Sequence, residues 1–378
     1  MFAAGRANSP PSSARLPAPR TRIGTQVNEP AKNRVSRSRQ FTHQRVTIHD
    51  VAREAGVSTA TVSRVIRETG YPVSATARQR VVDAVRKLGY YPNDLARSLL
   101  SERTNNIGVI VPDLSNPHYP AVMIGLEEIA SRHSYSVILH TTDEQPEKLA
   151  TYLKSLASKR VDGVVLAAGG TDPDEESLRA IADMRMPAVV VGRYTDTRFP
   201  TVESNNHLAG KLAAEHLRQL GHRRIGILTG PPESSSSADR TEGAIAFLTS
   251  NGAPVDESLV VGGDYLAESG YLAARQLLGL AGPPTALIAA TDRMAAGAMA
   301  AAHDLGLSLP DQLSIVGYDN IDIAQYLRPA LTTISLPDKL MGRMAMTKLH
   351  ELINGRAVEH HSVLDVQLIV RASTSPAS

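Results

Sequence analysis

The chain has 378 residues, 42% of them apolar, and a formal net charge of +2 at pH 7, which predicts two or three domains with substantial cores. Without cysteine it can have no disulfide, thiolate metal site or cysteine nucleophile, and nothing points to an oxidising compartment. No run of eighteen apolar residues suits a membrane span and no secretory segment opens the chain, so we expect a cytoplasmic protein.

Residues 1–45 are rich in Pro, Ser, Ala and Arg without apolar periodicity, which predicts a disordered basic extension. Nine basic residues stand against the single acid Glu29, and this excess points to a polyanion at one end of the chain. The segment is either an arm that attracts phosphates nonspecifically or a dispensable extension, including one from a start codon placed too far upstream. We favour the second interpretation because the segment has no defined spacing.

Apolar periodicity predicts three short helices around one small core in residues 46–92. The first helix ends at Gly56, Ser58 is a natural N-cap for the second, and the third runs from a cap at Ser74 to Gly89. Residues 93–104 are predicted to form a hinge, in which 93–100 hold one or two marginal helical turns. The expected core side chains are Ile48, Val51, Ala52, Ala55, Val62, Val65, Ile66, Ala77, Val81, Val85 and Leu88.

The tight turn at 55–58 is typical of a helix-turn-helix, whose second helix lies in the major groove of DNA. The outward face of this helix carries small and hydroxyl side chains that permit close approach, together with Arg64, which can bind guanine O6 and N7 bidentately. Periodicity alone fits a small three-helix bundle with a solvated Ser/Thr face equally well.

From residue 107 onward, short β-branched runs alternate with helical segments, which predicts an α/β fold with parallel sheets and crossover helices. The runs lie at 107–111, 137–139, 161–166, 188–191, 225–228, 287–290 and 315–316, and two sheets fit this length better than one. Ligands of such sheets bind beyond the carboxyl ends of strands. Polar or aromatic residues at those positions are Asp113, Asn116, His118, Tyr119, Arg193, Asp292 and Asp319.

Carboxylates and Arg at these positions suit hydroxyl-rich or anionic ligands, and a ring from Tyr119 or Tyr265 can cover the apolar face of a sugar. Metal and catalytic sites find little support. His360 and His361 are adjacent and cannot present two ligands from one helical face, the scattered Asp and His match no catalytic spacing, and the glycines at 228–232 lack the Gly-Lys-Ser/Thr of a phosphate loop. We therefore expect no cofactor, no metal and no enzyme activity.

The stretch 46–66 (VTIHDVAREAGVSTATVSRVI), followed by 87–93 (KLGYYPN) and 96–99 (ARSL), closely resembles the headpiece of the LacI/GalR family of repressors. Further similar segments are 106–117 (NIGVIVPDLSNP), 221–225 (GHRRI), 291–295 (TDRMA) and 314–319 (SIVGYD), so the resemblance covers roughly 47–373. It implies that 105–378 form a domain like a periplasmic sugar-binding protein. Lobe 1 is then about 105–203 with 335–362, and lobe 2 about 204–334 with 363–378.

The resemblance also implies roles for individual headpiece residues. Leu99 matches the hinge leucine that wedges between base pairs from the minor groove and kinks the duplex. Arg67 and Leu100 depart from the family's usual Asn and basic residue. Thr59, Ala60 and Arg64 fall at base-reading positions and Thr47, Thr61 and Ser63 near phosphates, so the residues expected at DNA are Thr47, Ser58, Thr59, Ala60, Thr61, Ser63, Arg64 and Leu99.

In the larger domain, Arg240 matches the family's ligand-contacting arginine and Asp319 its carboxylate near the cleft. Two alternatives stay open: Arg240 pairs with Glu242 or a helix end, and Asp319 caps a helix. His118 replaces a common aromatic and 234–237 is an unusual serine run, so the ligand's identity does not carry over. The expected effector-binding residues are Asp113, Asn116, His118, Tyr119, Arg193, Arg240, Tyr265, Asp292 and Asp319.

The resulting hypothesis is a sequence-specific repressor of carbohydrate metabolism genes, with double-stranded DNA and a small sugar as its partners. One headpiece reads few base pairs, so we expect a homodimer on a palindromic operator, and the lack of a heptad tail after Val370 favours a dimer over a tetramer. The rivals are a solute-binding transport protein, which needs an export signal, and a doubly wound enzyme, which needs a nucleophile or cofactor loop; the sequence shows neither feature.

Overall fold

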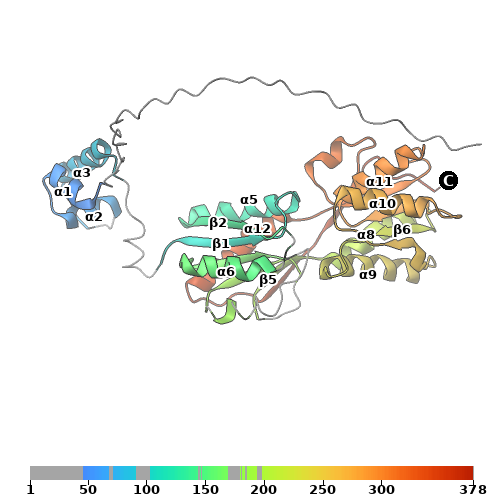
Figure 1. The fold of residues 1–378 in the computed structure, drawn as a ribbon, viewed down its shortest axis with the longest axis horizontal. Helices are drawn as coiled ribbons and strands as arrows, with labels where there is room; N and C mark the ends of the chain where they lie inside the picture. The colour runs from blue at the N-terminus through green and yellow to red at the C-terminus, as the bar shows by residue number, and fades with distance from the viewer. Residues whose placement is uncertain are drawn as a thin grey trace, which may run out of the picture. The chain divides into compact units, whose positions relative to one another are not determined.

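The computed structural model describes residues 46–67, 71–90, 103–143, 145, 147–168, 179, 181–183, 185–193 and 198–377. The chain divides into two compact units, Met1–Pro92 and Asn93–Ser378 (Figure 1). The predicted extension 1–45 and most of the predicted hinge, Leu99 included, lie outside the described residues.

The first unit contains the three predicted helices, α1 (Ile48–Ala55), α2 (Thr59–Arg67) and α3 (Ala75–Leu88). Its core centres on Val51, Val62 and Val81, one from each helix, and all three are fully buried. Each of the three short amphipathic helices thus turns the apolar face predicted by its 3.6-residue periodicity toward a shared core. Val85 and Leu88 pack against the same cluster but stay half-buried.

The second unit contains two six-stranded sheets. In the first, the order β11-β5-β4-β3-β1-β2 is parallel throughout; in the second, β12-β10-β9-β8-β6-β7, only β12 runs antiparallel. The strands are β1 (Asn106–Val111), β2 (Ser136–Thr141), β3 (Gly163–Ala167), β4 (Ala188–Val191), β5 (Thr201–Ser204), β6 (Ile225–Leu228), β7 (Val260–Val261), β8 (Ala286–Ala289), β9 (Ser314–Asp319), β10 (Thr332–Ser335), β11 (His361–Leu364) and β12 (Gln367–Ile369).

Helices cover both faces of each sheet, so each lobe has three layers (Figure 1). In lobe 1, α5 (His118–Arg132) and α12 (Asp338–Ile353) pack on one face and α6 (Glu147–Ser158) on the other. In lobe 2, α8 (Asn206–Gln219) and α9 (Ser235–Ser250) cover one face and α10 (Ala267–Leu278) and α11 (Asp292–Asp304) the other, with short 3-10 turns η1 (Glu257–Leu259) and η2 (Asp322–Tyr326).

Successive residues along a strand pack into the hydrophobic cores on opposite faces of the sheet. Val109 packs under α5 and α12, whereas Ile110 packs under α6. Because both faces are covered, the strands are continuous apolar runs rather than alternating patterns. This explains why the sequence showed them as unbroken β-branched stretches.

The chain crosses between the lobes three times, after β5, after β10 and after β11. All seven predicted runs form strands, and the expected fold class of a helix-turn-helix headpiece with a two-lobed parallel α/β domain is confirmed. Five strands escaped sequence analysis because they have two to four residues and several are rich in Thr, Ser or Gln: β5, β7, β10, β11 and β12.

Candidate functional site

Local hydrogen bonds fix the turn between α1 and α2. Thr47 and Asp50 form a capping box, in which the Thr47 amide and hydroxyl donate to Asp50 Oδ2 at 2.9 and 2.7 Å, and these bonds hold the pKa of Asp50 below its usual value. Gly56 ends α1 at φ +62°, a conformation that costs glycine little. Ser58 Oγ then accepts from the Thr61 amide at 3.1 Å and starts α2.

One face of α2 is free of the core. Ser58, Ala60 and Arg64 are exposed, while Thr59, Thr61 and Ser63 are half-buried and Thr47, before α1, is exposed. The Arg64 guanidinium lies 5.4 Å from the centre of the exposed Tyr71 ring. The face therefore offers hydroxyls, a methyl group and one cationic fork, the groups that reach phosphates and base edges in a major groove.

A cavity of about 410 Å³ lies between the lobes of the second unit. Residues from the carboxyl ends of strands in both sheets line it, where parallel sheets bind ligands. Seven predicted effector residues are brought together there: Asp113, Asn116, His118, Tyr119, Arg240, Tyr265 and Asp319.

Sequence reasoning missed several lining residues, among them Asp143, Asn206, Asp264 and Arg293. Asp143 and Asp264 follow β2 and β7, so the rule that found the others would have found them had those strand ends been placed correctly. Nothing local marks Asn206, which the chain reaches at its first crossing between the lobes.

Two predicted residues, Arg193 and Asp292, do not line the cavity. Arg193 turns aside to an ion pair with Asp239 on α9. Asp292 is buried at the start of α11, where Oδ1 accepts from the Thr333 hydroxyl at 2.5 Å and Oδ2 from the Ile321 amide at 2.9 Å. Burial raises the pKa of Asp292 to about 7. Both residues follow a strand end and so lie near the cavity, but their side chains point to other partners.

Arg240 is the centre of a polar network on the lobe 2 wall. Its Nε donates to Asn206 Oδ1 at 2.9 Å and Nη1 to the Ala290 carbonyl at 2.7 Å, and its guanidinium carbon lies 3.5 Å from the Tyr318 ring centre. The Tyr318 hydroxyl donates to the same Asn206 oxygen at 2.8 Å. The described ion pairs do not include the anticipated alternative, Arg240 with Glu242; the bonds to Asn206 and Ala290 hold the guanidinium beside the cavity.

Asp319 ends β9 at the cavity wall, where a hydrogen bond from the backbone of Asp292, the first residue of α11, acts to lower the pKa of its carboxyl. Its backbone has φ +116°, which non-glycine residues seldom adopt. The side chain is buried and, among the described residues, Oδ2 has no hydrogen-bond partner. Burial raises its pKa, Asp292 adds to the shift by repulsion, and Arg240 opposes it. A buried carboxyl oxygen without a partner beside a cavity is a group that a ligand hydroxyl can satisfy.

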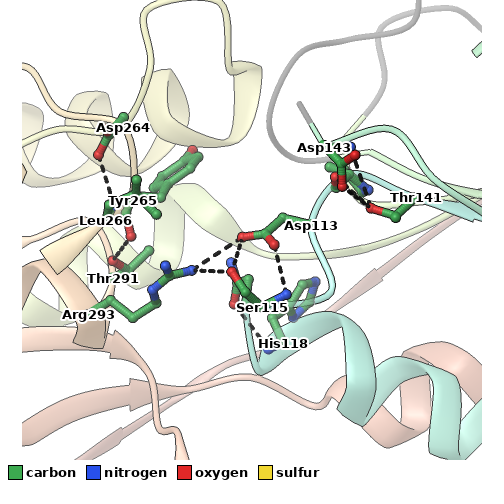
Figure 2. Close-up of polar contacts among 12 residues, drawn as sticks. Asp113, Ser115, His118, Thr141, Asp143, Asp264, Tyr265, Leu266, Thr291 and Arg293 are labelled. Atoms are coloured by element: carbon green, nitrogen blue, oxygen red, sulfur yellow. Dashed lines mark hydrogen bonds and ion pairs between the residues drawn. The ribbon is translucent and has the colours of Figure 1, made fainter. Parts of the chain in front are cut away.

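Among the described residues, two ion pairs bridge the lobes beside the cavity. Asp113, after β1, accepts from Arg293 Nη1 at 3.3 Å, and the Ser115 amide and hydroxyl hold the carboxylate at 2.7 and 2.8 Å (Figure 2). The second bridge joins Arg193 in lobe 1 to Asp239 in lobe 2.

The serine run at 234–237 supports one aromatic wall. Ser234 caps α9, and its Oγ lies 2.7 Å from the Tyr265 hydroxyl, while Ser237 Oγ accepts from the Gly230 amide at 2.8 Å. A Cβ at Gly230 would approach the Tyr265 ring to 2.1 Å, so only glycine lets the ring lie against this loop. The run is thus explained by its support of Tyr265, a ring that lines the cavity.

Comparisons with known proteins agree with both units. Residues 47–93 match the model of bacterial regulatory proteins of the lacI family, and residues 214–374 match a periplasmic binding protein-like domain. Catabolite control protein A of Priestia megaterium is 37% identical over 317 residues, which cover 83% of this chain and 94% of that protein. The chain belongs to the lacI family.

Solved structures extend the comparison. The Lac repressor dimer bound to operator and the anti-inducer ONPF is 31% identical, with TM-score 0.79 over 88% of this chain and all of that one. The CelR–cellobiose complex is 30% identical, with TM-score 0.68 over 87% of this chain and all of that one. The regulator is therefore a DNA-binding transcriptional repressor of this family, and the expectation that it is not an enzyme is confirmed.

The described residues contain no helix that is both long and apolar enough to cross a membrane. They also contain no group of three His, Asp or Glu side chains that could hold a metal ion.

Proposed function

We propose that the protein represses carbohydrate metabolism genes from the cytoplasm, as a homodimer on a palindromic operator, and that a sugar bound between its lobes controls operator affinity. The observation that carries the proposal is the cavity, whose lining brings together Arg240 from α9, Tyr265 and Asp319, the last with an oxygen that has no partner among the described residues. The hydroxyls of a pyranose or furanose can accept from such a donor and donate to such an acceptor, and the C–H face of its ring can pack on an aromatic side chain. The solved structure of the transcriptional regulator CelR, to which this chain is similar, is that of a complex with cellobiose.

For the DNA-binding half, we propose base contacts from Thr59, Ala60 and Arg64, supported by the exposure of the α2 face. Thr47, Ser58, Thr61 and Ser63 would contact phosphates, and Leu99 would open the duplex from the minor groove. The Lac repressor, with which this chain shares its fold, is a dimer bound to operator.

A rigid element supports coupling between the halves. Asp338 Oδ1, at the first turn of α12, lies 2.9 Å from His118 Nδ1, and His118 lines the cavity. At the last turn of α12, the Ile353 carbonyl and Asn354 Oδ1 accept from Arg103, each at 3.1 Å. Arg103 is the second-last residue of the predicted hinge, 93–104. A ligand that touches His118 can thus act on the hinge through one helix, by as much as it discriminates between two states.

The DNA assignment is tested by selecting bound duplexes from a random pool and measuring operator affinity of Arg64→Ala. We expect a loss of about 1–3 kcal/mol and relaxed specificity at one base pair. Arg78→Ala, which removes an exposed arginine from α3, is the matched control and should lose only a small salt-dependent part. Equal losses in the two variants would contradict the groove assignment.

The effector assignment is tested by titrating the operator complex with ribose, glucose, lactose and cellobiose. We expect at least one sugar to change operator affinity, by about 5- to 150-fold as in typical allosteric coupling. Arg240→Met should abolish the response. If no sugar acts, the carbohydrate part of the proposal fails while specific DNA binding stands.

A further inference from the structure

The cavity lining contains many charged side chains, and how they are paired restricts the ligand's charge. Three basic groups line the cavity in the described part of the chain, Arg240, Arg293 and His118. Arg293 is paired with Asp113 at 3.3 Å, and His118 Nδ1 lies 2.9 Å from Asp338 Oδ1. Two of the three thus already face a carboxylate.

The third, Arg240, has no carboxylate in ion-pairing contact among the described residues, but its charge acts on Asp319, whose pKa it lowers. Its Nε–H and one Nη1–H donate to Asn206 and the Ala290 carbonyl, which uses two of the five guanidinium N–H groups. Arg240, which has no direct ion pair in the described lining, therefore already interacts electrostatically with the acidic neighbour Asp319.

The acidic groups are less well compensated. Asp143 pairs with Lys148 at 2.8 Å, but Asp264 accepts only from the Leu266 amide at 2.9 Å in the described contacts (Figure 2). Asp319 keeps one buried oxygen with no partner among the described residues. Two carboxyls, Asp264 and Asp319, thus face the cavity with only Arg240 to offset them.

We propose that this cavity selects an uncharged polyol and rejects the phosphorylated or carboxylated form of the same sugar, with Asp264 and Asp319 as the specificity-determining residues. The inference rests on the proposed function and narrows its ligand class. A hydroxyl can donate to Asp319 Oδ2 without bringing charge. A phosphate or carboxylate would enter beside two acids, one of them buried, and in the described lining would find only Arg240 as a cation without an ion pair.

The electrostatics of Asp319 point the same way. Burial and the neighbouring Asp292 and Asp338 raise the pKa of this carboxyl, so its surroundings oppose negative charge even on the residue itself. A ligand anion at the same place would meet the same repulsion.

The lobe walls supply the rest of an uncharged sugar's needs. Tyr119, Tyr265, Leu266, Leu336 and Met341 line the cavity beside the polar groups. Such carbon-rich surfaces cover the C–H faces of a sugar ring. The volume of about 410 Å³ lies within the range of small-molecule sites.

The test uses matched pairs: ribose and ribose 5-phosphate, glucose and glucose 6-phosphate, cellobiose and cellobionate. Calorimetric titration of the full chain should show at least one neutral sugar binding ~100-fold more tightly than its acidic partner, about 2.7 kcal/mol. Tighter binding of any acidic partner would overturn the inference but leave an effector site between the lobes. Binding of none of the six would overturn both the inference and the carbohydrate proposal.

Two isosteric variants locate the source of selectivity. Asp264→Asn keeps the bond from the Leu266 amide but removes the charge, and should reduce the neutral-to-acidic ratio at least ~10-fold. The control is Asp256→Asn, since Asp256 accepts from the Ser258 amide at 2.8 Å in the same way but is not part of the cavity lining. An unchanged ratio in Asp264→Asn, or an equal fall in Asp256→Asn, would contradict the electrostatic origin.

Discussion

In the helix-turn-helix unit, Thr47 bonds to Asp50, Thr61 to Ser58 and Ala77 to Ser74, each pair three positions apart. In the effector cavity, the groups that hold Arg240 lie 34 and 50 positions away. Both regions present polar side chains for a ligand. They differ in the range over which the chain specifies them.

The difference has consequences for stability and for function. A reading surface built from local caps tolerates the loss of one cap, because the remaining core of Val51, Val62 and Val81 still holds the helices. A wall built from a network loses several partners at once when its central residue is removed. We therefore expect mutational effects to be larger around the cavity than around the caps.

The largest effect is expected from Arg240→Met. It leaves the Ala290 carbonyl unpartnered and removes one donor from Asn206, at a cost of about 2–3 kcal/mol in the unfolding of the second unit. Urea unfolding followed by circular dichroism measures it. Arg275→Met is the control, because Arg275 is exposed and contacts only Tyr271. A difference below 1 kcal/mol between the unfolding free energies of the two variants would contradict the expectation that the network around Arg240 is more sensitive to mutation than a helix cap.

Next comes the packing of α12 on α5. A Cβ at Gly342 would lie 1.9 Å from the Val122 carbonyl oxygen, so Gly342→Ala must push the helices apart, and we expect a loss of about 1–3 kcal/mol. Gly262→Ala, whose Cβ would come no nearer than 3.9 Å to its neighbours, should be almost neutral. Thermal unfolding of the two proteins, compared side by side, decides whether this interface is as tight as described.

A smaller effect is expected at the cap itself. Ser58→Ala removes the acceptor of the Thr61 amide and should cost about 1 kcal/mol in the first unit alone. Ser63→Ala, in the middle of α2, should cost nothing, because alanine favours helix. Hydrogen exchange of α2 amides separates the two, and a loss that spread to the second unit would sink the idea of a local cap.

The smallest effect is expected in the pH dependence of stability that arises from His222, which bonds to Ser375 near the C-terminus. His222 is buried, with Nδ1 2.9 Å from the Thr285 hydroxyl and Nε2 3.0 Å from the Ser375 carbonyl, and burial lowers its pKa below 6.5. The unfolded chain therefore binds the proton first as pH falls. The stability is complete above pH 6.5 and declines as pH drops toward the lowered pKa. His222→Gln should flatten this part of the stability profile, and unchanged slopes would exclude it.

Much of this protein was available from sequence. Apolar periodicity and capping residues gave the starts of the three helices of the first unit, and the ends of the first and third, to within a residue, because those signals act between near neighbours. Seven strands were visible because burial on both faces makes them continuous apolar runs. The family resemblance supplied the function class and pointed to Arg240 and Asp319.

Tertiary structure alone decided which strand-end residues face the cavity. Arg193 and Asp292 satisfy the same positional rule as Asp113 and Asp319, yet an ion pair and a buried hydrogen-bond network draw them away. Short-range energetics determine where helices and strands begin, because each turn or strand contributes its own bonds. The pairing of charges across two lobes depends on distances set by the whole fold, so the sequence could identify the acids but not which one keeps a free oxygen.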